Sequence, residues 1–165
     1  MTRAGLLFPL LAVLLVACSR QEQLKIDSIG AEDEFIVNFS SPAAALDSER
    51  FYLTCDLGAG FWPDGETSGP RFYLIGRQIE KAGAASAGWQ NYRARMSFDS
   101  TDRDQLRAAS KAEVASVLAA RQNIDCRLAA KSWHMGQPEP ISSVAALPLA
   151  AARQWLAANE KWANF

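Results

Sequence analysis

Apolar and polar residues alternate along much of the chain from residue 24 to residue 98, and this period of two predicts β-strands. The alternating stretches predict strands over 24–28, 35–39, 50–57, 71–78 and 89–98. The middle of 71–78 is apolar at successive positions, which predicts a strand covered on both faces at the centre of its sheet. In 89–98 the residues Tyr92, Ala94, Met96 and Phe98 share one face and the other face is polar, so this strand is expected to have one solvated face.

After residue 100 the spacing of apolar residues becomes helical. Thr101–Asp104 resembles a helix-capping box, and Leu106 and Ala109 follow at helical spacing. Ser110–Glu113 has a similar pattern, so the segment predicts either one helix or two short ones. Cys126 lies in a further predicted strand over 124–133.

The last predicted element is an alanine-rich helix over about 148–162. Its apolar stripe includes Trp155 and Trp162, which are seven residues apart and therefore lie on nearly the same side. Packing on the core is the favoured role of this stripe, and docking to a partner is the alternative. A shorter helical turn is expected at Ser41 and Pro42, with Ser41 as the N-cap.

This order of elements predicts an α+β fold. Several strands are followed by a helix, a strand and a helix, which favours a mainly antiparallel sheet of five or six strands with two or three helices packed on one face. The alternative is a small β-barrel with a C-terminal helix, because strands that suit hairpin connections dominate the first 98 residues.

The first 17 residues have the features of a secretory signal peptide. Arg3 supplies a positive charge, the run from Leu6 to Val16 is apolar without a charged residue, and the small Ala17 precedes Cys18. This apolar run is too short to cross roughly 30 Å of hydrocarbon as a stable transmembrane helix.

The stretch Leu15-Val16-Ala17-Cys18 resembles the lipobox of bacterial lipoproteins. The resemblance implies that residues 1–17 are cleaved and that Cys18 is acylated on its thiol and on its new amine. Several acyl chains would hold the protein on a bilayer, since each buried methylene contributes about 0.8 kcal/mol. Ser19 stands where an aspartate retains enteric lipoproteins in the inner membrane, so the class implies the outer membrane, facing the periplasm. An ordinary secretory signal that contains a cysteine is the alternative.

Cleavage would leave 148 of the 165 residues, which suits one domain. We expect residues 18–23 to be the lipidated cysteine and a short tether, and residues 24–165 to be a single periplasmic domain. The mature chain would carry 16 basic and 18 acidic residues without a long basic run, so nucleic acid is not an expected partner.

The other two cysteines fit an oxidising compartment. Once lipid occupies Cys18, an even pair remains, and we predict a disulfide between Cys55 and Cys126. No Cys-x-x-Cys motif indicates redox chemistry, and no cysteine–histidine spacing indicates zinc.

An unusual loop between the third and fourth predicted strands is the leading candidate for binding a partner. Residues 58–70 contain four glycines and two prolines together with Phe61 and Trp62. Aromatic side chains in a loop either fold back over the sheet or meet a partner, and tryptophan is a common anchor of interfaces. Asp64 and Glu66 complete this candidate site; loop solvation is a better account of these two carboxylates than a weak cation site.

Catalytic patterns are weak throughout the chain. His134 is the only histidine, so it favours a structural or surface role. Ser86 lies in a small-residue loop between two predicted strands, whereas a nucleophile elbow needs a strand before the serine and a helix after it. Asp99, Asp102 and Asp104 lack the glycine and glutamate of a calcium loop. We therefore expect no enzyme activity, no metal site and no cofactor.

The leading functional hypothesis is a membrane-anchored, non-catalytic protein-binding module. One version is an inhibitor or immunity protein that acts against a cell-wall-degrading effector. Tyr52–Gly58 and Ser68–Phe72 resemble the cysteine strand and Ser-Gly-x-x-Tyr segment of lysozyme-inhibitor lipoproteins, but Phe72 replaces the tyrosine and the rest of the pattern is missing. The alternatives are a structural or assembly lipoprotein of an envelope or secretion complex, and a small hydrolase that uses His134.

Overall fold

The computed structural model describes residues 23–30, 34–42, 51–58, 71–102, 105–130 and 139–159. These residues form eight strands: β1 (Lys25–Ile29), β2 (Ile36–Pro42), β3 (Phe51–Asp56), β4 (Arg71–Lys81), β5 (Trp89–Asp102), β6 (Gln105–Ala108), β7 (Asp125–Ala130) and β8 (Ala145–Ala146). They also form two helices, α1 (Lys111–Ala120) and α2 (Leu149–Ala158).

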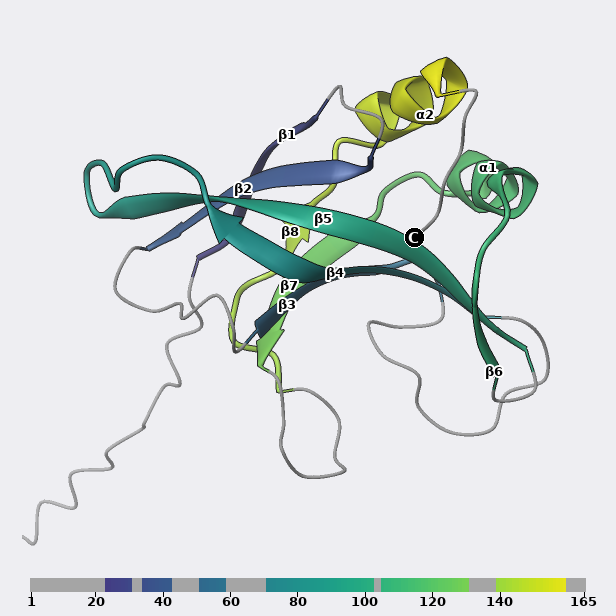
Figure 1. Cartoon of the computed structure of the whole chain (residues 1–165), viewed down its shortest axis with the longest axis horizontal. Helices are drawn as coiled ribbons and strands as arrows, with labels where there is room; N and C mark the ends of the chain where they lie inside the picture. The colour runs from purple at the N-terminus through teal and green to yellow at the C-terminus, as the bar shows by residue number, and fades with distance from the viewer. Residues whose placement is uncertain are drawn as a thin grey trace, which may run out of the picture.

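All eight strands belong to one antiparallel sheet (Figure 1). The strand order is β1-β2-β5-β4-β3-β7-β8, and β6 pairs with the far end of β5. The two end strands approach each other, because the backbone N–H of Leu24 donates to Ser143 Oγ at 3.2 Å beside them. The sheet is therefore curled almost into a barrel. It combines the predicted sheet-and-helix fold with the barrel alternative, and it has more strands than the five or six expected.

The β4–β5 hairpin is the longest pairing in the sheet. It runs from the Arg71–Thr101 pair to the Lys81–Tyr92 pair, and β4 stands at the middle of the strand order, as its apolar sequence predicted. The opposite edge of β5 is shared, since β2 pairs with residues 89–95 and β6 with residues 99–102.

One extra residue, Arg77, interrupts the hairpin as a β-bulge. Gly76 pairs with Met96 and Gln78 pairs with Arg95, so no residue of β5 lies opposite Arg77. A bulge bends its strand and increases the local twist. A side chain at Gly76 would force its neighbours to move, because a Cβ atom would lie 2.6 Å from Met96 Sδ and 3.0 Å from Ala94 Cβ.

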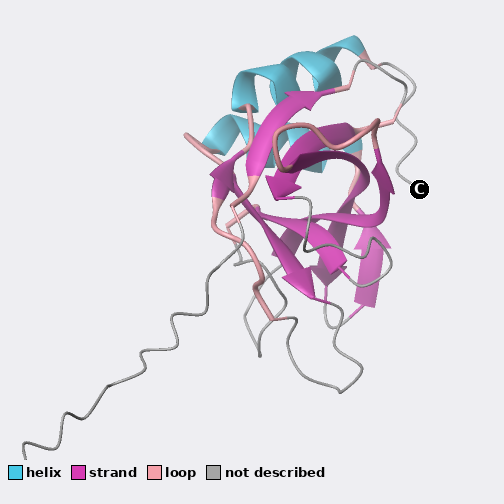
Figure 2. Ribbon diagram, turned by 90° about the vertical axis from the view of Figure 1, so that its left-hand side faces the viewer, coloured by secondary structure: helices cyan, strands magenta, loops and turns pink. Residues whose placement is uncertain are grey.

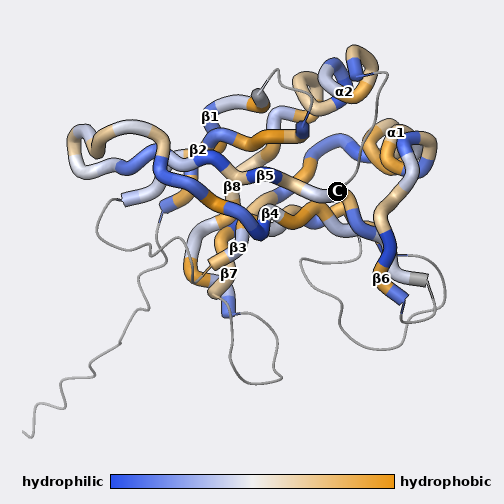
Figure 3. The backbone as a smooth tube through the Cα atoms, in the orientation of Figure 1, coloured by the Kyte–Doolittle hydropathy of each residue, from blue (hydrophilic) through white to orange (hydrophobic). Residues whose placement is uncertain are grey.

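The predicted buried face of β5 is confirmed. Apolar and polar positions alternate along the strands (Figure 3), and the predicted apolar face of β5 is buried in the core. Tyr92 stacks on Phe39 with ring centroids 5.3 Å apart and meets Phe51 edge-on at 6.0 Å. These aromatic contacts join β2, β3 and β5 inside the curled sheet.

Both helices lie on the same side of the sheet (Figure 2). Ser110 is the N-cap of α1. Its side chain and that of Glu113 cap each other's backbone N–H groups, as the sequence predicted. Trp155 of α2 packs edge-on against Phe35 at 4.8 Å, which confirms a core role for this tryptophan. The Arg153 guanidinium donates to the backbone oxygens of Leu118 and Arg121, which ties α2 to the end of α1.

Two helical predictions were wrong. Thr101, Asp102 and Gln105–Ala108 do not form a helix, because β5 continues to Asp102 and Gln105–Ala108 pairs with it as β6. Ser41 and Pro42 end β2 opposite Gln90 and Trp89 instead of starting a helical turn. In both places pairing with β5 satisfies the backbone, and tertiary pairing of this kind overrides a local capping pattern.

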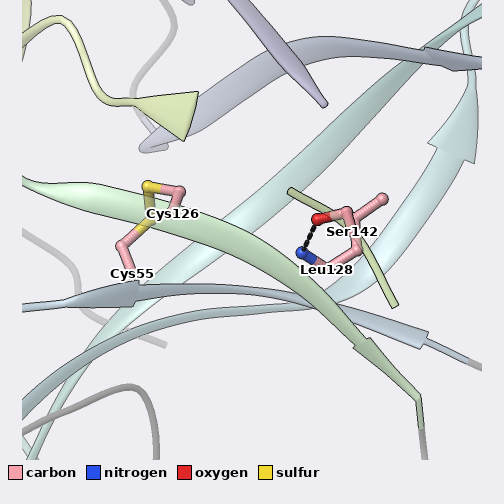
Figure 4. The surroundings of a disulfide bond; sticks show 4 residues. All are labelled: Cys55, Cys126, Leu128 and Ser142. Atoms are coloured by element: carbon pink, nitrogen blue, oxygen red, sulfur yellow. Dashed lines mark hydrogen bonds between the residues drawn. A yellow bond between two sulfur atoms is a disulfide. The ribbon is translucent and has the colours of Figure 1, made fainter. Parts of the chain in front are cut away.

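The predicted disulfide is confirmed. Cys55 and Cys126 face each other across β3 and β7, with an S–S distance of 2.02 Å and no exposed surface (Figure 4). Close by, Ser142 Oγ accepts a hydrogen bond from the buried backbone N–H of Leu128 at 2.8 Å. The bond closes a loop that contains β4, β5, β6 and α1, so it links distant parts of the chain.

Replacing both Cys55 and Cys126 by alanine is expected to lower the free energy of unfolding. The cysteines are 71 residues apart, and a loop of that length corresponds to about 4 kcal/mol in the chain-entropy model. Urea denaturation of the oxidised protein measures the loss. Val144→Ala, at a side chain that is 52% exposed, is the control and should change little. Equal stability of the wild-type protein and the double variant would contradict a structural role for the bond.

Gly76→Ala should destabilise the fold by about 1–3 kcal/mol, because the new methyl group overpacks a filled site. The first atom that it meets is Met96 Sδ. Met96→Ala should therefore cost less stability in the Gly76→Ala background than in the wild type, and a double-mutant cycle of thermal unfolding measures the difference. Additive losses would show that the two side chains do not compete for space.

Candidate binding groove at the β4 bulge

Most candidate site residues from the sequence lie outside the described residues. These are Cys18, Phe61, Trp62, Asp64, Glu66 and His134. Of the residues singled out for pairing, the structure brings Cys55 and Cys126 together. A different set of residues forms a hollow on the described surface.

The hollow lies beside the bulge and has a volume of about 250 Å³. Phe35, Ile75 and Met96 supply its apolar lining, and each of them is less than a tenth exposed. The polar lining consists of Glu34, Arg77, Gln78, Arg95 and Ser97. Apolar surface with a few polar groups around it is the usual composition of a binding pocket.

The strand pairing explains why the hollow forms here. Strand β2 pairs with β5 up to Arg95, and β6 begins to pair at Asp99. Between them, Met96 N–H donates to Phe35 O at 2.9 Å. On one edge of β5 the partner strand changes from β2 to β6, and on the other edge β4 has its bulge at the same level. The outer surface of the sheet is hollowed where these two irregularities meet.

A second hollow of about 210 Å³ continues from the first. It is lined by Ile36, Gln78, Glu80, Arg93 and Arg95, and it shares Gln78 and Arg95 with its neighbour. We call the two hollows together the bulge groove. Strands β2, β4 and β5 all contribute to it.

Two ion pairs organise the charges of the groove. Arg95 Nε lies 2.6 Å from Glu34 Oε2, and Arg77 Nη2 lies 3.0 Å from Asp99 Oδ2. The side chains of Arg77 and Arg95 are each 51% exposed, so both guanidinium groups still face solvent while they are paired. Half-exposed guanidinium groups can bind carboxylates or backbone carbonyls of a partner through several donors.

Asp99 is the most perturbed acid beside the groove. Its side chain is 8% exposed, and burial raises the pKa of its carboxyl group above the ordinary value. The Arg77 charge opposes this rise, as do hydrogen bonds to the carboxylate from Ser97 and Arg77. Through its ion pair and hydrogen bond, the buried aspartate orients the exposed side chain of Arg77.

The sequence contained only part of the signal for this groove. Arg93 and Arg95 belong to the face of 89–98 that the sequence predicts to be polar, and this face lines the groove. Arg77 and Glu34 carried no such signal. The bulge shifts Arg77 relative to the alternating pattern, and Glu34 reaches Arg95 through tertiary pairing.

Two further features bear on function. Among the described residues, no group of three or more histidine, cysteine, aspartate or glutamate side chains could hold a metal ion. No helix in this part of the chain has the length and apolarity needed to cross a membrane.

The chain was compared with protein-family models, curated proteins and solved structures, and nothing matches it in any of the three.

Asp99→Asn should change how stability depends on pH. A carboxyl group with a raised pKa takes up its proton in the folded state first, so the wild type gains stability as pH falls from 7 through that pKa. The asparagine variant lacks this gain. Chemical denaturation between pH 7 and pH 4 should show the wild type becoming more stable relative to the variant.

Arg77→Gln is the companion variant for this measurement. Removal of the guanidinium takes away an interaction that lowers the pKa of Asp99. The stability gain should then begin at a higher pH than in the wild type. Parallel pH profiles for the wild type and Asp99→Asn would contradict the burial of an ionised carboxylate at this place.

Proposed function

We propose that the chain is a lipid-anchored periplasmic protein that acts as a non-catalytic protein-binding module. The lipobox-like stretch supports an anchor at Cys18. The bond between Cys55 and Cys126 supports an oxidising compartment, since disulfides are rare in the cytosol. It also leaves Cys18 as the one cysteine of the three that is free for acylation.

The observation that carries the binding proposal is the pairing of half-exposed arginines with an apolar lining in the bulge groove. Arginine is enriched at protein interfaces, where its planar group binds several acceptors at once. Arg77 and Arg95 are each oriented by a carboxylate, and their backbones belong to paired strands. A partner that binds here would pay little conformational entropy for ordering the site.

A finer version of the proposal is an inhibitor or immunity protein that acts against a cell-wall-degrading effector. Phe61, Trp62, Asp64 and Glu66 remain the proposed second contact with such a partner. Their loop follows β3, the strand that the disulfide joins to β7. Aromatic residues in the segment that follows a disulfide-bridged strand would suit inhibition by insertion into a cleft.

The two alternatives gain less support. An assembly lipoprotein would gain support from an apolar stripe of the C-terminal helix that is free to dock, but α2 buries Ala152, Trp155 and Leu156 in the core. A hydrolase would depend on His134, which lies outside the described residues.

Photo-crosslinking in living cells tests where the partner binds. A crosslinking amino acid at Gln78 in the groove should form a covalent product with one periplasmic protein, which mass spectrometry identifies. The same substitution at Gln154, an exposed position of α2, is the matched control and should give no such product. A crosslinker at Trp62 should capture the same protein if the loop is the second contact.

Arg95→Ala should reduce the Gln78 product because it removes an exposed guanidinium of the groove, while the protein remains folded and abundant. Equal products from Gln78 and Gln154 would contradict the groove as the binding site. A product from Trp62 alone would assign binding to the loop instead.

A further inference from the structure

The tip of the β4–β5 hairpin has a composition unlike the rest of the surface. We define the hairpin tip as residues 82–88. Between Lys81 and Trp89 the sequence contains only alanine, glycine and one serine, Ser86, and it carries no charge. Residues 83–88 are all exposed. Figure 1 shows the tip projecting at one end of the molecule, with α1 at the other.

Hydrogen bonds fix the conformation of the hairpin tip. Ser86 and Trp89 exchange backbone hydrogen bonds of 2.8 and 2.9 Å, and the Gln90 side chain donates to Gly83 O at 3.0 Å. Ala82 N–H donates to Asn91 O at 2.8 Å. With these hydrogen bonds made, residues 83–88 stay exposed to water. The tip can therefore lie at a hydrated lipid surface without a charged side chain that must lose its water.

The base of the tip carries groups that suit the surface of a membrane. Lys25 Nζ lies over the Trp89 ring, 3.9 Å from its centroid, and Lys81 ends β4 on the other side of the hairpin. Tryptophan concentrates at the interface between lipid and water, and lysine is attracted to anionic headgroups. The nearby acidic side chains have neighbours of their own: Asp27 accepts from Ser40, and Glu80 stands opposite Arg93.

The beginning of the folded domain connects this surface to the proposed anchor. Leu24 is 6% exposed, and its backbone N–H donates a hydrogen bond to Ser143 Oγ. Leu24 is therefore packed into the folded domain. It follows Cys18 by six residues, and a chain of that length spans at most about 20 Å. Lys25 is the next residue, and it already touches the base of the tip.

We propose that the hairpin tip, with Lys25 and Trp89 at its base, rests on the bilayer that holds the acylated Cys18. This inference depends on the lipid anchor of the proposed function. It adds an orientation, in which the tip faces the lipid surface and α1 points away from it.

Environment-sensitive fluorescence on the full acylated protein tests this orientation. Ala85→Cys in the tip and Ala115→Cys on the exposed surface of α1 are labelled separately with a nitrobenzoxadiazole dye. The proteins are reconstituted in vesicles of phosphatidylcholine and phosphatidylglycerol that carry a nitroxide quencher in the headgroup region. Cys55 and Cys126 are bridged and buried, so they do not react with the dye.

The expected result is loss of fluorescence at position 85 and none at position 115. Lys25→Gln combined with Lys81→Gln should weaken the loss at position 85, because it removes both charges that favour phosphatidylglycerol. If quenching at position 85 is undiminished in that double variant, Lys25 and Lys81 do not contribute to contact with the bilayer.

Vesicle flotation separates the failure of this inference from failure of the anchor. If the wild type floats with the vesicles but position 85 is quenched no more than position 115, the anchor stands and the orientation is wrong. If the wild type does not float, whereas a chain with an authentic lipoprotein signal does, the anchor fails and the orientation falls with it.

Discussion

The long pairing of β4 with β5 is the constraint on which the rest of the structure depends. Ten residues of β4 pair with ten residues of β5, and all other strands attach directly or indirectly to this pair. Because side chains alternate along a strand, the inner face of β5 supplies Tyr92, Ala94, Met96 and Phe98 to one core. The disulfide then fixes β3 to β7 on the β4 side of the sheet.

The single bulged residue in this hairpin has consequences at the surface. It bends β4 beside the point where β5 changes partner from β2 to β6. The surface opens there, and Arg77 and Arg95 stand on either side of apolar side chains that belong to the core. Each arginine is tied to a carboxylate, so their positions are set before any partner arrives.

The two ends of the hairpin would then serve different purposes. The closed end holds the uncharged tip beside Lys25, close to where the chain leaves the proposed anchor. The open end extends toward α1 and the second half of the chain, through the strand β6. With the tip on the bilayer, the groove near the middle of the hairpin would remain open to soluble partners.

Much of the architecture was predicted from local pattern. Period-two alternation located five strands, and the even cysteine pair predicted the disulfide. The capping box at Ser110 and the stripe around Trp155 also held, because each depends on residues within a few turns of one another. The strand β8 was missed because it consists of two alanines, which carry no alternation.

The sequence by itself determined the inward faces of the strands, the start of α1 and the availability of Cys55 and Cys126 for each other. Only the tertiary structure decided that Gln105–Ala108 extends the sheet, that the ends of the sheet meet, and that a groove opens at Arg77. The reason is physical: hydrogen bonds between strands and the position of a bulge depend on which segments lie side by side. That neighbour relation is a property of the folded chain, and no local period records it.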